Sequence, residues 1–232
     1  MEQNLDFGIH QVITLFTIDG KPYGLTTTHI NTFLVMAVLT IFALIVRVKL
    51  KNFKTIPDTK FQVIIEFLVD TIYNFTSGTM GEKNKHFGSF YGPMFLFILL
   101  CNLTGLIGLR PPTADIATTF ALSLTTFFMI HYFGLKAKGA RYLKGFLEPM
   151  PLLLPLNIIG ELANPISLSF RLFGNILGGT IIMGLYYAMM PWWAKLGLPS
   201  ILHSYFDVFA GALQTLIFVM LSMTFVSSAM ED

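Results

Sequence analysis

LNIIGELANPISLSFRLFGNILGGT (residues 156–180) lies within a long apolar segment and still contains an arginine, Arg171. An arginine at bilayer depth costs about 2.5–3.5 kcal/mol on insertion scales, so it marks a functional position. At helical spacing, one face of this segment carries a polar stripe made of Asn164, Ser167, Arg171, Asn175 and Gly178. Because lipid offers such side chains no hydrogen-bond partner, the stripe is predicted to face protein or enclosed water.

The composition of the whole chain indicates a membrane protein. Only 12% of the 232 residues are charged and 54% are hydrophobic, whereas soluble domains carry about 25% charged residues. We therefore predict an all-α integral membrane protein that forms a single domain over residues 1–232. The single cysteine, Cys101, excludes an internal disulfide, and the acidic start MEQNLDFG does not resemble a signal peptide.

The first half of the chain is predicted to contain three spans and one interfacial helix. Residues 1–28 form an external segment with at most one amphipathic turn, and residues 30–46 form the first span. Residues 57–77 form an amphipathic helix on the cytoplasmic surface, and residues 90–135 form a hairpin of two spans. The apolar face of the interfacial helix consists of Phe61, Ile64, Ile65, Leu68, Ile72 and Phe75. Lysines and arginines cluster after residues 46 and 135, which places the N-terminus outside and the C-terminus in the cytoplasm.

The last two helices, within residues 155–229, are longer than a bilayer requires. At 1.5 Å per residue they would measure about 54 Å and about 46 Å, against a hydrocarbon core of about 30 Å. They are therefore predicted to form an oblique hairpin, with Pro165 as a possible kink and Trp192 and Trp193 at the joint near the water interface. Gly174 and Gly178 have the small-xxx-small spacing that lets another helix approach closely.

Four segments in matching order resemble subunit a of F-type ATP synthases. They are FILLCNLTGLIG from Phe97, PTADIATTFALSL from Pro112, PISLSFRLFGN (165–175) and LQTLIFVMLSMTFVSSAMED from Leu213. The resemblance implies the stator subunit of the membrane sector. Such a subunit forms two offset half-channels that pass protons or sodium ions to and from carboxylates of a rotating c-subunit ring.

The resemblance also implies the roles of particular residues. Arg171 matches the essential arginine that faces the ring carboxylate, and its guanidinium keeps its charge where a buried lysine can lose it. Asn175 and Gln214 match its polar neighbours, and the other ion-path candidates are Glu161, Ser167, Asp207, Asp115 and Asn102. The implied partners are the c-subunit ring, the peripheral-stalk b subunits and, indirectly, the catalytic head. The implied location is the inner (plasma) membrane, in contact with lipid. We expect no catalytic site, cofactor, metal or nucleic-acid partner, and no GxxxxGK[ST] nucleotide-binding motif occurs.

The chain departs from the family pattern at one pair of positions. Many members carry ionisable residues both shortly after FGN and seven residues before the glutamine, whereas here only the second position, Asp207, is ionisable. The first position is Gly179-Thr180, which slightly favours sodium, although the sequence leaves the coupling ion open. His131 and His203 are expected near helix ends and receive no functional role.

Plainer roles remain open for the same residues. Asn102, Asn175 and Gln214 are also typical of interhelical hydrogen bonds, Asp115 of a helix cap, and Glu161 and Asp207 of charged helix ends. Two other functions are considered. A stand-alone secondary transporter often has inverted repeats, and none is found; an intramembrane hydrolase needs a histidine or aspartate beside Ser167 or Ser169.

Overall fold

The computed structural model describes residues 11–18, 21–147, 150–195 and 197–231. Within these residues, five helices are long and apolar enough to cross a membrane, and they cover Thr27–Leu50, Glu82–Ile107, Ile116–Lys138, Pro151–Met189 and Leu198–Met230. The predicted all-α integral membrane fold is thereby confirmed. The chain divides into two compact units at Cys101, and each unit is described by itself. Whether they form a single membrane domain stays a prediction.

The first unit begins with a β-hairpin, which corrects the prediction for residues 1–28. Strands β1 (Gln11–Ile18) and β2 (Lys21–Thr26) pair antiparallel, where at most one amphipathic turn was expected. The sequence carries two strand signals here. The run from Val12 to Ile18 is rich in β-branched residues, and Asp19-Gly20 is a dipeptide typical of hairpin turns. Residues 1–10 of the predicted external segment lie outside the described residues.

Helix α1 (Thr27–Leu50) contains the predicted first span but continues past Arg47 for three residues. Long basic side chains can remain helical at a membrane surface because their alkyl stems stay in the apolar region while the charge reaches water. Only Thr28, Asn31 and Val35 of this helix are buried. An apolar helix with so little buried surface is suited to contact lipid.

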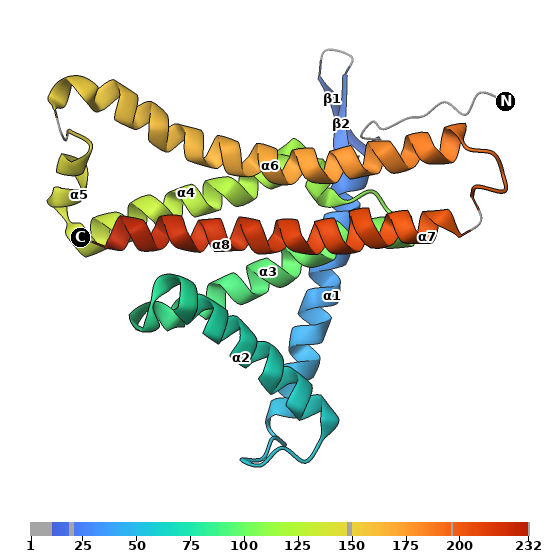
Figure 1. Cartoon of the computed structure of the whole chain (residues 1–232), viewed down its shortest axis with the longest axis horizontal. Helices are drawn as coiled ribbons and strands as arrows, with labels where there is room; N and C mark the ends of the chain where they lie inside the picture. The colour runs from blue at the N-terminus through green and yellow to red at the C-terminus, as the bar shows by residue number, and fades with distance from the viewer. Residues whose placement is uncertain (1–10, 19–20, 148–149, 196, 232) are drawn as a thin grey trace. The chain divides into compact units, whose positions relative to one another are not determined.

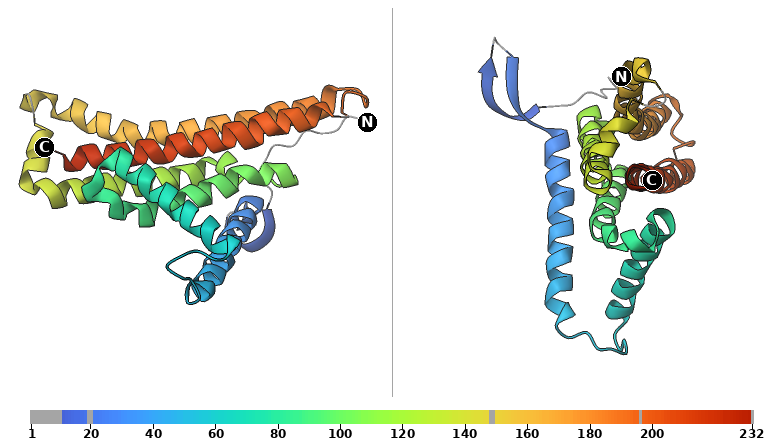
Figure 2. Two further views of the ribbon diagram at one scale, coloured as in Figure 1. Left: turned by 60° about the horizontal axis from the view of Figure 1, so that its bottom comes forward. Right: turned by 90° about the vertical axis from the view of Figure 1, so that its left-hand side faces the viewer.

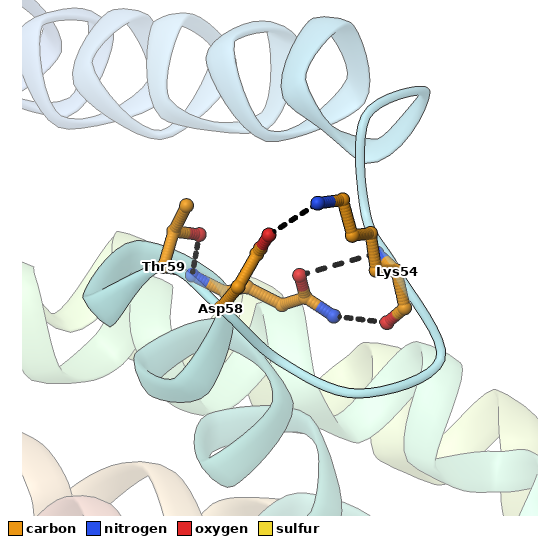
Figure 3. Close-up of polar contacts among 4 residues, drawn as sticks. Lys54, Asp58 and Thr59 are labelled. Atoms are coloured by element: carbon orange, nitrogen blue, oxygen red, sulfur yellow. Dashed lines mark hydrogen bonds and ion pairs between the residues drawn. The ribbon is translucent and has the colours of Figure 1, made fainter.

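Helix α2 (Lys60–Met80) corresponds to the predicted interfacial helix, and a polar network fixes its first turn (Figure 3). Thr59 accepts a hydrogen bond from the Gln62 backbone N–H at 3.3 Å, and Lys54 pairs with Asp58 at 2.5 Å. The Gln62 amide donates to the Lys54 carbonyl at 2.6 Å and to Glu66 at 2.7 Å. Gln62 is therefore buried with its hydrogen bonds satisfied, while Ile64, which was predicted on the apolar face, is 62% exposed.

Helix α3 (Gly88–Leu103) follows the short 3-10 helix η1 (Glu82–Phe87). A Cβ on Gly92 would lie 3.1 Å from Ile72, so this glycine allows α3 to approach α2 closely. The 3-10 helix η2 (Thr104–Ile107) ends at Gly108, whose φ of 73° suits a residue without Cβ. The predicted hairpin of residues 90–135 covers α3 and the next long helix, α4.

The second unit is a bundle of long helices that lie side by side (Figures 1 and 2). It contains η3 (Pro112–Ala114), α4 (Ile116–Lys138), α5 (Ala140–Gly145) and η4 (Pro151–Leu153). Helix α6 (Leu154–Met189) then runs back along α4, and α7 (Leu198–His203), η5 (Ser204–Ala210) and α8 (Gly211–Met230) form the last helical run. The two over-long helices are confirmed in length, whereas their tilt in a membrane stays a prediction.

The two long helical runs differ in their irregularities: one contains a proline and the other a π-helical segment. Helix α6 has 36 residues and continues through the buried Pro165. The last run contains a π-helical segment, η5, between α7 and α8. π-Helical turns are rare, and those that occur often lie at functional sites. Segment η5 is therefore a candidate position for functional side chains.

Candidate functional site

Helices α6 and α7–α8 run antiparallel, and two side-chain hydrogen bonds fix their register. Near the joint, the Tyr187 hydroxyl lies 3.0 Å from His203 Nε2. Three turns further along α6, Asn175 Nδ2 donates to Gln214 Oε1 at 2.6 Å. Four residues beyond each member of the second pair lie Arg171 on α6 and Phe218 on α8. The predicted proximity of Gln214 to the region of Arg171 is therefore explained by this register.

Arg171 is exposed at the middle of α6. Among the residues that the structure describes, it has no hydrogen bond or ion pair. An unpaired guanidinium in a membrane span is costly. Compensation for this charge, whether by water, lipid or another protein, therefore comes from outside the described part of this chain.

The polar stripe of α6 lies opposite its packed face. Leu168, Leu172 and Ile176 are buried on the packed face, whereas Ser167, Arg171, Gly174 and Asn175 are exposed. The stripe was predicted to face protein or enclosed water. Within the described chain Asn175 contacts Gln214 of α8, whereas Ser167 and Arg171 are exposed. A Cβ on Gly174 or Gly178 would meet no atom within 4 Å, so the close approach expected there is not used inside this chain.

Helix α4 braces the packed face of α6 and the facing side of α8. Thr119 and Ser169 hydroxyls lie 3.0 Å apart between α4 and α6, and Thr126 and Ser222 hydroxyls lie 2.8 Å apart between α4 and α8. All four side chains are buried. These pairs hold the two long helices in a fixed relation, which a site built on both of them requires.

Asn102 lies in a fully satisfied buried network near the start of α8. Its amide donates to the Gly211 carbonyl at 2.9 Å and to the Thr215 hydroxyl at 3.0 Å, and its oxygen accepts from Thr113 at 2.6 Å. With 1% of its surface exposed, Asn102 acts as a brace in this geometry. Its proposed part in ion passage stays a prediction.

Asp207, in the π-helical segment, is hydrogen-bonded through its carboxylate to Nδ1 of His203. The pair lies beside Gly105, whose added Cβ would be 3.1 Å from the Asp207 carboxylate. His203 also contacts Tyr187 of α6, so the three side chains form a continuous hydrogen-bonded row. From the sequence, His203 was expected near a helix end and received no role. The signal that could have found it is the spacing of His203 and Asp207 at i and i+4.

A cavity of about 660 Å³ opens at the opposite ends of the same helices. Glu161 and Asn164 line it from α6, and Asn164 lies 3.4 Å from the Glu161 carboxylate. Lys138 and Arg141 line it from the side of α4 and α5. This polar hollow brings together two of the predicted residues of the α6 segment and extends to within two turns of Arg171.

Tyr142 of α5 also lines this cavity, and its hydroxyl lies 3.1 Å from His131 Nδ1. Burial, followed by the nearby Glu161 carboxylate, raises the pKa of Tyr142. The Tyr142 ring packs so closely on α4 that a Cβ on Gly134 would lie 2.5 Å from it. His131 thus positions Tyr142 at the cavity wall.

The remaining predicted residues have distinct settings. Asp115 caps α4 by accepting a hydrogen bond from the Ala117 N–H at 3.0 Å, as its plainer role predicts. Ser167 is exposed on the stripe. Gln214 is 2% exposed, and its Nε2 has no hydrogen-bond partner among the described residues. A buried donor of this kind is unfavourable unless water or another group satisfies it.

Comparison with known proteins gives one consistent result. A family model described as "ATP synthase A chain" matches residues 29–227. "ATP synthase subunit a" of Nitratidesulfovibrio vulgaris (strain DP4) is 39% identical over 94% of this chain and 94% of its own. "ATP synthase subunit a, sodium ion specific" of Propionigenium modestum is 33% identical over 90% of this chain and 76% of its own. "ATP synthase subunit a" of Moorella thermoacetica is 32% identical over 89% of this chain and 92% of its own.

Proposed function

The chain belongs to the ATP synthase A chain family, and we propose that it is the ion-conducting stator subunit of the membrane sector of such a synthase. Its relatives named as subunit a cover nearly its whole length, which does not favour a stand-alone transporter. The subunit is multi-pass and contributes to ATP synthesis without a catalytic site of its own. The N-terminus and the α6–α7 joint lie outside the cell, and the C-terminus lies in the cytoplasm.

The observation that carries this proposal is the unpaired Arg171 on an exposed polar face of α6. The missing partner is a carboxylate on a neighbouring ring of c subunits. A fixed cation attracts an ionised ring carboxylate and favours release of the ion that the carboxylate carried. Gly174 and Gly178 have free space above them, which lets the ring helices come close to the arginine.

Two separate polar regions supply the half-channels. The inner route is the cavity beside Glu161 and Asn164. The outer route runs along the row that contains Asp207 and continues toward Gln214 and Asn175. Between the two, at the level of Arg171, Leu172 and Phe218 are completely buried, and this apolar layer directs the ion onto the ring.

The ring converts ion flow into rotation. Each ion that crosses 100 mV provides about 2.3 kcal/mol, and the ring transmits this energy to the catalytic head on other chains. Peripheral-stalk b subunits hold the present chain fixed against the ring. Asp115 and Asn102 lie toward the outer entrance in this scheme, and Ser167 lies between Arg171 and the inner route.

The test is the variant Arg171→Ala in the whole synthase, reconstituted in liposomes. We expect loss of both ATP-driven ion pumping and ion-driven ATP synthesis, with the complex still assembled. Arg171→Lys should also fail, because an ammonium lacks the planar guanidinium and loses its proton more readily. Arg47→Gln is the matched control, since Arg47 is exposed near the end of α1. Undiminished ion-driven synthesis by Arg171→Ala would overturn the proposal.

A further inference from the structure

The cavity beside Glu161 has two cationic residues in its wall, Lys138 and Arg141, and the function proposed above uses neither of them. We propose that these two side chains bind the phosphate of an anionic phospholipid head group, and that the hydrocarbon of the lipid lies along the adjoining surface of α6. This inference takes from the proposed stator function only the position of the cavity on the inner route.

The charge of the cavity wall favours an anion. Among the described lining residues, Lys138 and Arg141 are opposed by a single carboxylate, that of Glu161, which leaves a net charge of +1. A phosphodiester carries one negative charge, so it matches this excess. Lysine and arginine donate charge-assisted hydrogen bonds to phosphate oxygens, and such bonds are about twice as strong as those between neutral groups.

Lys138 is placed to hold a ligand from outside the chain. It is the last residue of α4 and is half-buried, and it has no hydrogen bond or ion pair within the described part of the chain. Partly buried charges are screened by salt less than exposed ones. An anion that reaches Lys138 inside the cavity is therefore bound more firmly than one at an open surface.

The lining also has an apolar part that a free phosphate ion would leave unused. Ile130, Phe146, Leu156 and Phe225 contribute to the wall. Leu156 is 64% exposed, and Ile159, three residues further along α6, is 62% exposed. The volume of about 660 Å³ lies within the range of about 300–1,000 Å³ that is usual for organic ligands.

A ligand that carries both a phosphate and hydrocarbon therefore fits this site better than a small ion does. Five helices of the described chain are long and apolar enough to cross a membrane, so phospholipids surround the cavity at high local concentration. Basic pockets between transmembrane helices, on the cytoplasmic side, are suited to the head groups of acidic lipids. The orientation proposed above places the cavity on that side.

A bound head group would also assist the inner route. Lys138 and Arg141 repel any cation that approaches Glu161 through the same cavity, and a bound phosphate offsets this repulsion. We therefore expect ATP-driven pumping to become faster as phosphatidylglycerol replaces phosphatidylcholine in the vesicle. The increase should be smaller in Lys138→Gln, because part of the repulsion is already removed in that variant.

Photolabelling of the assembled synthase tests the site directly. The synthase is reconstituted in phosphatidylcholine vesicles that contain a trace of photoactivatable phosphatidylglycerol, and the labelled residues are mapped by mass spectrometry. We expect label on the cavity wall that is displaced by unlabelled phosphatidylglycerol and not by inorganic phosphate. Lys138→Gln and Arg141→Gln should each reduce this label roughly tenfold, as expected for a hydrogen bond to a charged group. Lys138→Arg should retain it.

Lys136→Gln is the matched control. Lys136 is exposed in the last turn of α4 and does not line the cavity. Its substitution removes the same charge from the same end of the helix, so it measures the general attraction of this surface to acidic lipid, which is about fivefold at most for one residue. Assembly of the complex, measured for every variant, shows whether lost label reflects a lost subunit.

Two results would overturn the proposal. The first is label on the cavity wall that falls no further in Lys138→Gln and Arg141→Gln than in Lys136→Gln. The second is displacement by inorganic phosphate as effective as displacement by phosphatidylglycerol, which would show a small anion as the ligand.

The binding measurement does not depend on ion transport, so the two proposals can fail separately. If Lys138→Gln and Arg141→Gln label normally while Arg171→Ala does not pump, the lipid site is refuted and the stator function stands. If Arg171→Ala pumps normally while Lys138→Gln loses its label, the stator function is refuted and the lipid site stands.

Discussion

Asn102→Ala separates the structural role of this asparagine from the ion-path role that the resemblance to the family implies. The substitution removes hydrogen bonds to Gly211, Thr215 and Thr113 from a side chain that is 1% exposed. Side-chain hydrogen bonds between helices in membrane proteins average about 0.6 kcal/mol each. Three such bonds predict a loss of about 2 kcal/mol, or roughly a 30-fold change in the unfolding equilibrium.

The assay has two readouts on the purified synthase. Thermal unfolding in detergent measures the stability of the subunit, and pumping per assembled complex, below the unfolding range, measures ion passage. We expect reduced stability and nearly normal pumping. Asn84→Ala is the control. Among the described residues, the Asn84 side chain bonds only to the nearby Met80 carbonyl, so its removal should change stability by at most about 0.5 kcal/mol.

A double-mutant cycle with Thr113→Val checks the magnitude. Thr113 donates to the Asn102 oxygen, so the two substitutions should be non-additive by about 0.6–1.7 kcal/mol. Full stability in Asn102→Ala would refute the bracing role. Lost pumping with full stability would instead support the ion-path role of Asn102.

Two further predictions concern the wall of the inner cavity. Gly134→Ala places a Cβ 2.5 Å from the Tyr142 ring. Because the ring must move, thermal unfolding should show a free energy of unfolding lower by about 1–3 kcal/mol. Gly160→Ala is the control: its Cβ would meet no atom within 4 Å, so its effect should be neutral or slightly stabilising. Because the folded-state pKa of Tyr142 is raised, its contribution to stability is full below the ordinary tyrosine pKa of about 10 and is lost as the pH rises through the folded value. An ultraviolet titration should show this late ionisation, Tyr142→Phe should remove it, and Glu161→Gln should reduce the shift; an unshifted Tyr142 would contradict both the burial and the effect of Glu161.

Helical periodicity was sufficient to predict the long helices and the stripe around Arg171, because apolar length and 3.6-residue spacing are local properties. The hairpin at β1 and β2 was missed because residues 1–28 were interpreted as a mixed external segment with one possible amphipathic turn, although Val12–Ile18 and Asp19-Gly20 carried strand and turn signals. On α2 the polar Gln62 takes a buried position, whereas Ile64 of the predicted apolar face is exposed. That outcome depends on the bonds of Gln62 to Lys54 and Glu66, and no hydropathy pattern contains them.

In the site, too, some features followed from the sequence and others depend on tertiary contacts. Asn175 and Gln214 were predicted together, and the structure joins them at 2.6 Å. Gly179-Thr180 was noted as lacking the ionisable residue of the family pattern, and the structure shows that Asp207 is hydrogen-bonded to His203, four residues earlier on the same run.

The arrangement of polar and apolar layers explains why an arginine at this point must work with a moving partner. Inward of Gln214 the facing helices present completely buried apolar groups, Leu172 on α6 and Phe218 and Val219 on α8. Moving an isolated charge through such a layer costs tens of kcal/mol in the Born limit, far more than the roughly 2.3 kcal/mol that 100 mV provides. No direct passage between the outer row and the inner cavity is then open to an ion. In the proposed function, the low-energy route leaves this chain at the exposed stripe, as a neutralised group on another protein, and Arg171 makes that group release its ion before it returns.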